Sequence, residues 1–318
     1  MSCLQRSIRA FAMADTPVVS SLAIPAVPAP NAPLSATPFA RILRLLWHDR
    51  SARSALLFLA ILLLSAIAAP WLAPYDPARP LDPVARAVAP SVANWFGTDL
   101  TSRDVLSRML FGARVSLAVA ALAALLASGV GLLYGGVAGY AGGRIDGLMM
   151  RVVDALLAIP RILLLLTVLA LWGTVDVRTL VVLLGLTGWF AVARLARGEA
   201  ASLRNRDFVV AARALGAGPV RTFVRHVLPH AAGPVLVATT IAIGQVIILE
   251  AGLSYLGYGI PQPTPTWGNI IREGRESIAS TWWLIVFPGL ALIGTALAMN
   301  TVADRLRIVL NPRQLPAP

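Results

Sequence analysis

Six apolar stretches, each long enough to cross a lipid bilayer, dominate the 318-residue chain. A helix needs about 20 mostly apolar residues to span the hydrocarbon core, where every backbone polar group must find its partner within the segment. The predicted spans are residues 55–73, 115–133, 152–172, 179–195, 232–256 and 283–302. With 57% hydrophobic and only 13% charged residues, the chain is not an ordinary soluble domain. We predict an all-α polytopic membrane protein with six transmembrane helices.

The distribution of arginine predicts how these spans are oriented. All 27 basic residues are arginines, and 18 of them fall in the two termini and in the second and fourth loops, against eight in the other loops. Because cytoplasmic loops carry an excess of basic residues, we expect a multi-pass protein of the cytoplasmic (inner) membrane with both termini in the cytoplasm. The net charge of +12 is then explained by topology, which removes the case for nucleic acid as a partner.

The residue types of common catalytic and metal sites are missing from the sequence. A P-loop needs a lysine to reach the phosphates of ATP, and the chain has no lysine. It has one cysteine, Cys3, and three histidines, His48, His226 and His230, none of them in a zinc-binding HExxH pattern. We therefore expect a protein that is not itself an enzyme and that has no catalytic residue, no metal site and no bound cofactor.

The segment between the fourth and fifth spans, residues 198–230, has the pattern of two short helices joined by a tight turn. Apolar side chains share one face of the first helix at i, i+3, i+4 and i+7, namely Phe208, Ala211, Ala212 and Leu215. Gly216 suits the left-handed conformation that ends a helix. Pro219 suits the first turn of a second helix, predicted at 220–227 and ended by Pro229. The periodicity alone leaves open an amphipathic helix that rests on the lipid interface.

Several short motifs resemble one family of membrane proteins. Ala211-Ala212, Gly216 and Leu228-Pro229 are similar to the cytoplasmic "EAA" loop of permease subunits of binding-protein-dependent ABC importers, although Val210 replaces the acidic residue that names the motif. The run AARALGA followed by RHVLP resembles the dipeptide, oligopeptide and nickel branch, in its C-type permease. PWLAPYDP, NWFGTDLTSRDVLSRMLFGARVSL and YLGYGIPQPTPTWGNII extend the resemblance over roughly residues 41–313.

The resemblance implies the transmembrane domain of a type I ABC importer that takes up peptides or a related small solute. It implies a second permease subunit, two cytoplasmic ATPase subunits that use ATP, and an external solute-binding protein. The short loop helix would be the coupling helix that seats in a groove of an ATPase. The residues expected to couple are Asp207, Phe208, Ala211, Ala212, Arg213, Leu215, Gly216, Ala217, Arg225, Leu228 and Pro229. The main alternative is a secondary transporter driven by an ion gradient, for which we find no convincing repeat.

On this basis we expect four regions along the chain. They are a disordered cytoplasmic tail at 1–40, a first transmembrane helix and external loop at 41–111, an ABC transmembrane core at 112–304 that contains the coupling loop 198–230, and a second cytoplasmic tail at 305–318.

Polar residues inside the predicted spans are candidates for the translocation path, since they are costly in a bilayer. They are Glu250, Gln245, Asp154 and Arg161. Asp154 and Arg161 are seven residues apart and share a helix face, so they could pair or extend their charged ends to the cytoplasmic interface. Pro160 between them is expected to kink the helix. For Glu250, a structural hydrogen bond to a neighbouring helix is as consistent with the sequence as contact with substrate.

Two further patterns concern packing and the outer surface. Gly131, Gly135 and Gly139 recur at four-residue intervals and predict close approach of another helix. A polar group ahead of the second span either forms a turn that caps this helix or contacts a partner permease or binding protein. Its residues are Gly97, Thr98, Asp99, Arg103 and Asp104.

Overall fold

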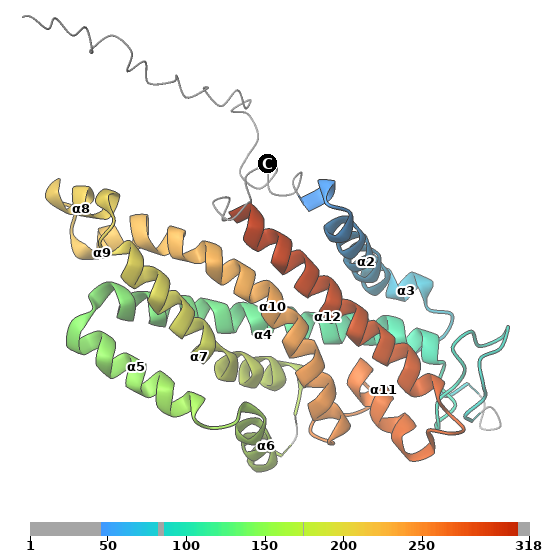
Figure 1. Ribbon diagram of the computed structural model, residues 1–318. Coiled ribbons are helices and arrows are strands. Elements are labelled where there is room, and N and C mark those ends of the chain that lie inside the picture. Colours follow the sequence, from blue (N-terminus) through green and yellow to red (C-terminus); the bar gives the residue numbers. More distant parts are fainter. Residues whose placement is uncertain (1–45, 82–85, 174, 311–318) are drawn as a thin grey trace, which may run out of the picture. The chain divides into compact units, whose positions relative to one another are not determined.

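The computed structural model describes residues 46–81, 86–173 and 175–310, and the described residues form helices and connecting segments with no β-strand (Figure 1). The helices are α2 (Arg50–Ile67), α3 (Ala69–Leu72), α4 (Val105–Ala141), α5 (Gly143–Leu157), α6 (Arg161–Trp172), α7 (Val177–Leu203), α8 (Asp207–Ala214), α9 (Pro219–Thr222), α10 (Leu228–Tyr255), α11 (Trp267–Gly274) and α12 (Trp283–Leu310). Five helical stretches are long and apolar enough to span a membrane, and α5 with α6 makes a sixth if the bent pair counts as one span. The prediction of an all-α protein with six spans is thereby confirmed.

Helix α4, at 37 residues, is the structural centre, and α7 packs along it. The glycines at positions 131, 135 and 139 make this contact possible. A Cβ atom added to Gly131 would lie 2.6 Å from the Cβ of Val192, and one added to Gly135 would overlap the backbone of Ala193. The sequence therefore predicted the close packing correctly, because small residues at intervals of four let two helix backbones meet.

The third predicted span is broken into two helices. Helices α5 and α6 meet at an angle of 77° across the break that contains Pro160. The kink was expected, since proline lacks the N–H group that continues a helix. The pairing of Asp154 with Arg161 was wrong, because so large a bend ends the shared helix face on which the prediction depended. Both residues instead contact α7, as described below.

Several predicted boundaries also shift. The loop expected between the predicted spans 115–133 and 152–172 shrinks to the junction at Gly142, because α4 continues through Ala141 and α5 begins at Gly143. Helix α12 runs through Leu310, so the boundary expected at residue 304 lies inside a helix. The tail expected at 1–40 lies outside the described residues.

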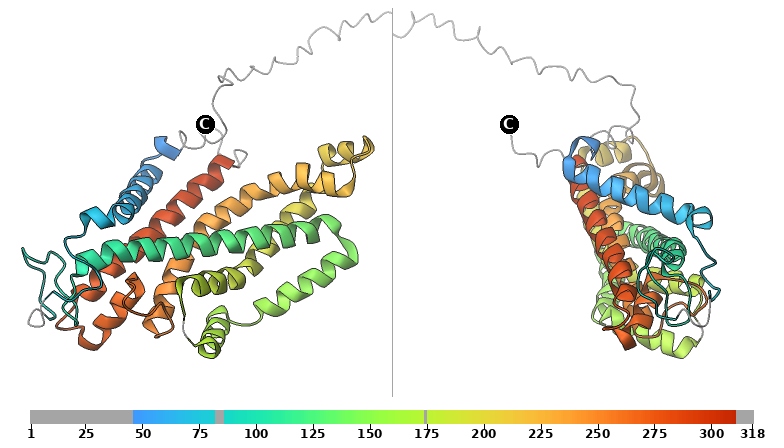
Figure 2. Two further views of the ribbon diagram at one scale, coloured as in Figure 1. Left: turned by 180° about the vertical axis from the view of Figure 1, so that it is seen from behind. Right: turned by 90° about the vertical axis from the view of Figure 1, so that its right-hand side faces the viewer.

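The two ends of the helical bundle carry different structures. Helices α8 and α9 lie at one end, beyond the last turns of α4 and α7, whereas α11 and the segment before α4 lie at the opposite end (Figures 1 and 2). We call these the α8 end and the α11 end. The carboxylate of Asp49, ahead of α2, forms an ion pair of 3.1 Å with Arg305 of α12 and ties these two helices together.

A buried ion cluster fastens the α11 end. Arg108 of α4 donates hydrogen bonds of 2.6 Å to each carboxylate oxygen of Glu273 on α11 and also bonds to Asp99. Arg103 donates a bond of 2.7 Å to Asp99. Burial opposes ionisation of Asp99, but the charges of Arg108 and Arg103 and the backbone N–H of Arg103 outweigh it and hold the pKa of this carboxyl below its ordinary value.

The polar group ahead of the second span therefore caps α4 and joins three segments. Asp104 is the N-cap residue of α4, and its carboxylate accepts a bond of 2.8 Å from the backbone N–H of Ser107. The side chain of Trp283, at the start of α12, donates a bond of 3.1 Å to the backbone carbonyl of Thr98. All five residues of this group are buried within the chain, as the capping interpretation requires.

Candidate functional site

The α8–α9 loop has the helix, turn, helix geometry that its sequence predicts. Helix α8 is capped at its end by Leu215, and Gly216 follows with φ of +85°. The backbone N–H of Ala217 then donates a bond of 3.0 Å to the carbonyl of Ala212, which closes the turn. Only glycine takes a positive φ without steric cost, so Gly216 is the residue that allows this turn. Pro219 begins α9.

One side of α8 is anchored to the bundle. Val209 is fully buried in a small cluster with Ala200 of α7 and Val227. The guanidinium of Arg213, one turn further along the same side, lies over the ring of Tyr140 at 5.0 Å. These contacts hold α8 against the last turns of α4 and α7.

The opposite side of α8 is open. Leu215 is 88% exposed and Val210 is 52% exposed, and Ala211 lies between them on the exposed surface. Phe208 is partly exposed and packs on the His230 ring at a centroid distance of 5.0 Å. The apolar face predicted from the sequence thus faces away from the bundle, while Val209, which lies outside that pattern, is the anchor.

The other expected coupling residues lie around this helix. Asp207 is the first residue of α8 and is exposed, Ala212 is half-buried, and Ala217 borders the pocket described below. Arg225 is exposed, and Leu228 is half-buried beside an exposed Pro229.

The prediction that Pro229 ends a helix at Val227 was wrong. A π-helical turn at Phe223–Val227 connects α9 directly to α10, so residues 219–255 form one continuous helical segment. Pro229 stands in the first turn of α10, directly after the π-helical turn. Proline has no backbone N–H, so it suits a position in the first turn of a helix, where no hydrogen bond from that residue is needed. The turn at Gly216 is therefore followed by one continuous helical segment that reaches the α11 end.

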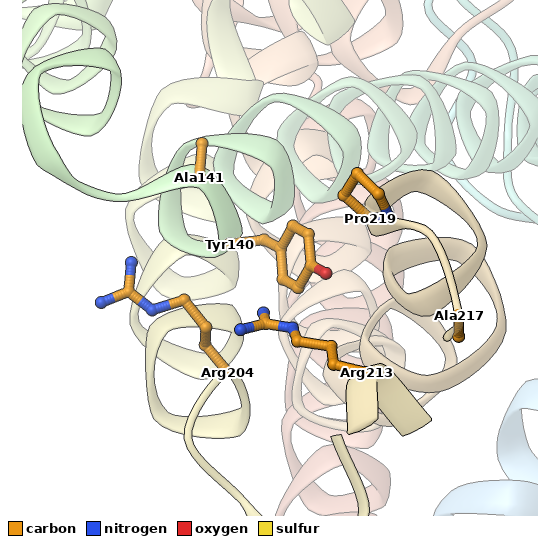
Figure 3. A pocket seen from close by; sticks show the side chains of 6 residues that line it. All are labelled: Tyr140, Ala141, Arg204, Arg213, Ala217 and Pro219. Carbon is orange, nitrogen blue, oxygen red and sulfur yellow. The ribbon is translucent and has the colours of Figure 1, made fainter. Parts of the chain in front are cut away.

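A pocket of about 570 Å³ lies between the loop and the bundle (Figure 3). Its lining residues are Tyr140, Ala141, Arg204, Arg213, Ala217 and Pro219. The side chain of Arg213 extends toward the Tyr140 ring, whereas the guanidinium of Arg204 points away from that ring (Figure 3). Sequence reasoning missed both Tyr140 and Arg204 as site residues. Tyr140 ends α4, which is far from α8 in the sequence, and Arg204 lies inside the predicted loop 198–230 but outside its apolar pattern.

Glu250 is fully buried in the bundle and bonded within the chain. Its carboxylate accepts hydrogen bonds from the hydroxyl groups of Ser254, at 2.9 Å, and of Ser116 on α4, at 3.3 Å. The Ser116 oxygen also accepts a bond of 3.3 Å from the backbone N–H of Trp267, the first residue of α11. Glu250 thus connects α10 with α4 and α11, which matches the structural alternative left open by the sequence.

The other three polar residues of the predicted spans are held differently. Asp154 accepts a bond of 2.6 Å from Arg194 of α7, and both side chains are 59% exposed. Arg161 donates a bond of 2.8 Å to the carbonyl of Leu184, also on α7. Gln245 is exposed on α10. Asp154 and Arg161 therefore attach the broken span to α7, and Gln245 and Asp154 remain accessible from outside this chain.

Among the described residues, no group of three His, Cys, Asp or Glu side chains could hold a metal ion. The geometry thus offers an anchored helix with an exposed apolar face, beside a basic pocket, at one end of a membrane-spanning bundle.

Comparison with known proteins shows which protein family the chain resembles. The family model described as "Binding-protein-dependent transport system inner membrane component" matches residues 127–315, and that of the "N-terminal TM domain of oligopeptide transport permease C" matches residues 37–90. The dipeptide transport system permease protein of Bacillus subtilis (strain 168) is 36% identical over 271 residues, which cover 85% of this chain and 84% of the relative. The nickel transport system permease protein of Escherichia coli (strain K12) is 38% identical over 262 residues, which cover 82% and 94%.

Proposed function

Because the chain belongs to the family of binding-protein-dependent transport system inner membrane components, we propose that its α8–α9 loop couples solute import to ATP hydrolysis by partner subunits. Membership makes it a multi-pass permease subunit of an ABC importer in the inner membrane and does not favour an ion-gradient-driven transporter. In the proposed assembly, a second permease subunit completes the pathway, two cytoplasmic ATPase subunits use ATP, and an external binding protein delivers the solute.

The exposed apolar face of α8 carries the proposal. Large apolar side chains such as Leu215 are costly to leave in water, and a contiguous exposed patch of them marks an interaction surface. The opposite side of the same helix is fixed by Val209 and Arg213, so a force on α8 reaches the bundle. Beyond Gly216, the segment 219–255 offers a continuous helical connection to the opposite end. An ATPase groove that moved α8 would therefore tilt a membrane-spanning helix.

The proposal places the α8 end in the cytoplasm. The arginine excess in the termini and in the loop 198–230 supports this orientation. A single-cysteine experiment tests it, because Cys3 is the only cysteine of the chain. In a Cys3→Ser background, Val210→Cys should react with a membrane-impermeant maleimide only in inverted vesicles, and Trp95→Cys, near the α11 end, only in right-side-out vesicles. The reverse pattern would refute the orientation.

We further propose that Gln245 and the Asp154–Arg194 pair face the translocation path or the second permease. Their exposure within membrane-spanning segments supports this, since an amide or a carboxylate is costly against lipid and needs protein or water beside it. Glu250 and Arg161 are assigned structural roles in this proposal, because their polar groups bond within the chain.

The cargo is proposed as a peptide or a related small solute. The relatives are named as transporters of dipeptide in one case and of nickel in the other, at almost equal identity to this chain. The sequence identity to these two permeases therefore does not decide between a peptide and nickel as the solute. The ligand bound by the cognate external binding protein identifies the cargo directly.

Two glycines of the loop test coupling with a matched control. Gly216 and Gly218 both have free space where a Cβ would stand, but only Gly216 has a positive φ. Gly216→Val should therefore strain the turn by about 1–2 kcal/mol or more, whereas Gly218→Val keeps an ordinary conformation. In proteoliposomes with all subunits, Gly216→Val should hydrolyse ATP with reduced uptake, while Gly218→Val transports normally. Equal uptake by the two variants would count against the coupling role.

A further inference from the structure

Arg161 is a cation in the broken span α5–α6 whose charge no carboxylate of the described residues balances. Its guanidinium donates hydrogen bonds to two groups of α7, the Leu184 carbonyl at 2.8 Å and the Thr187 hydroxyl at 3.3 Å. Both acceptors are neutral, and Arg161 forms no ion pair with any described carboxylate. Asp154, the partner that the sequence suggested, is held by Arg194 at 2.6 Å. The bonds to α7 thus orient the guanidinium and leave its charge unbalanced.

The same guanidinium also has hydrogen-bond donors that the chain does not use. An arginine side chain carries five N–H donors, and the bonds to α7 come from Nε and Nη2 of Arg161. Its Nη1 group donates to no acceptor among the residues that the structure describes. A carboxylate accepts two parallel N–H bonds from one guanidinium, so the end formed by Nη1 and Nη2 suits a carboxylate.

The contact with α7 shows how deep this charge lies along the span. Arg178 and Arg194 bound an uncharged stretch of α7, residues 179–193, which is about 22 Å long at about 1.5 Å per residue. Leu184 and Thr187 lie on either side of the midpoint of this stretch. The guanidinium that bonds to them is therefore far from both charged ends of α7, at a depth where an unpaired charge is costly.

A small pocket lies beside the guanidinium, between α7 and the bend that joins α5 to α6. Arg161 is the only charged residue that lines it. Gly188 of α7 makes room for the guanidinium, since a Cβ atom there would lie 3.0 Å from Nη2 of Arg161. The pocket volume of about 90 Å³ is well below the range of about 300–1,000 Å³ that is usual for small-molecule sites. It can accept the end of one side chain and not a whole solute.

The backbone at this bend also requires cover from outside the chain. Helix α5 ends at Leu157, α6 begins at Arg161, and the residues from Leu157 to Pro160 are all exposed. A helix that is interrupted at membrane depth is tolerated only where protein or a water-filled cavity covers its backbone. The bend therefore faces another protein or water, and not lipid.

We propose that an acidic side chain of the second permease subunit enters this pocket and forms an ion pair with Arg161. The inference rests on the proposed function, which supplies the second permease. It makes the bend between α5 and α6 a contact surface between the two permeases. The carboxylate would accept hydrogen bonds from Nη1 and Nη2, while Leu184 and Thr187 hold the other side of the guanidinium.

Two observations favour a side chain of the second permease over a carboxylate of the cargo. The charge of an arginine is permanent, whereas cargo is present only during part of a transport cycle, so the lasting cost of this buried charge requires a resident partner. The pocket is also too small to enclose a solute.

The association of the two permeases tests the proposal. The complete transporter would be purified in mild detergent through a tag on this chain, and the dissociation of the second permease would be followed as sodium dodecyl sulfate is added. Arg161→Gln should weaken the association by about 30-fold, because loss of one partner leaves the other charge buried and unpaired. Thr187→Val is the matched control, since it removes one hydrogen bond of the same guanidinium and keeps the charge. It should associate as the wild type does.

Neutralisation of the second permease identifies the paired residue. Each Asp or Glu in its membrane-spanning segments would be changed to Asn or Gln, in the wild-type and the Arg161→Gln backgrounds. At the paired position, the change should weaken association in the wild-type background and restore it in combination with Arg161→Gln, because no buried charge is then unpaired. This rescue is not expected if Arg161→Gln merely distorts the chain.

Two results would overturn the proposal. The first is equal association of the wild type and Arg161→Gln; a loss of uptake in that case would indicate that Arg161 contacts the cargo. The second is the absence of any carboxylate in the second permease whose neutralisation rescues Arg161→Gln. Association is measured without ATP and without cargo, so it is independent of the uptake assay on Gly216. A failure of coupling and a failure of this ion pair are therefore distinguishable.

Discussion

The contact between α4 and α7 at Gly135 makes a quantitative prediction. A Cβ atom at this position would overlap the carbonyl oxygen of Ala193 and lie 2.7 Å from its carbonyl carbon, where ordinary contact begins at 3.4 Å. The obstacle is backbone, so no side chain can rotate away. Gly135→Ala therefore forces the two helices at least 0.7 Å apart at this point. Overpacking of this kind costs about 1–3 kcal/mol.

Gly129 provides the control on the same helix. A Cβ there meets nothing within 4 Å, so Gly129→Ala changes helix propensity alone. Alanine is favoured over glycine in a helix by about 0.8–1 kcal/mol, and this gain is common to both variants. The free energy of unfolding of Gly135→Ala should thus fall below that of Gly129→Ala by about 1–3 kcal/mol.

The measurement is unfolding of each purified variant in mixed micelles, followed by tryptophan fluorescence. Displacement of α7 also moves Ala200, against which Val209 of the coupling helix packs, so uptake by Gly135→Ala should fall as well. Equal stability of the two alanine variants would refute the close approach of the helices and the packing role of the glycine repeat.

Two further predictions concern buried carboxylates. The pKa of Asp99 is held below its ordinary value, so its contribution to stability is complete above that ordinary value and is lost as the pH falls through the folded-state pKa. The temperature of thermal unfolding should therefore decrease below about pH 4. Asp99→Asn should weaken this dependence of the unfolding temperature on pH. Glu250→Gln keeps an acceptor for the Ser116 hydroxyl and should retain stability and uptake, whereas Glu250→Leu should lower the free energy of unfolding by about 1–3 kcal/mol. Loss of uptake in a stable Glu250→Gln protein would contradict the structural role.

Sequence patterns predicted the fold and the loop, because both depend on neighbours within a few residues. Hydrophobic length defines a span, a proline or glycine marks its break, and Gly216 specifies a turn through its own backbone. The same logic failed at Pro229, where the preceding π-turn supplied a place for proline inside a continuous segment. It also failed to separate the exposed face of α8 from Val209, because both sides of this helix carry apolar residues.

By itself, the sequence determined that the chain is a six-span membrane protein with a helix, turn, helix loop and the motifs of an importer permease. The tertiary structure decided which polar groups meet. Asp154 pairs with Arg194 and not with Arg161, Glu273 holds Arg108 across 165 residues of sequence, and Arg204 lies beside Tyr140. These pairings arise where separate helices pack, and local periodicity carries no information about which helix will be adjacent.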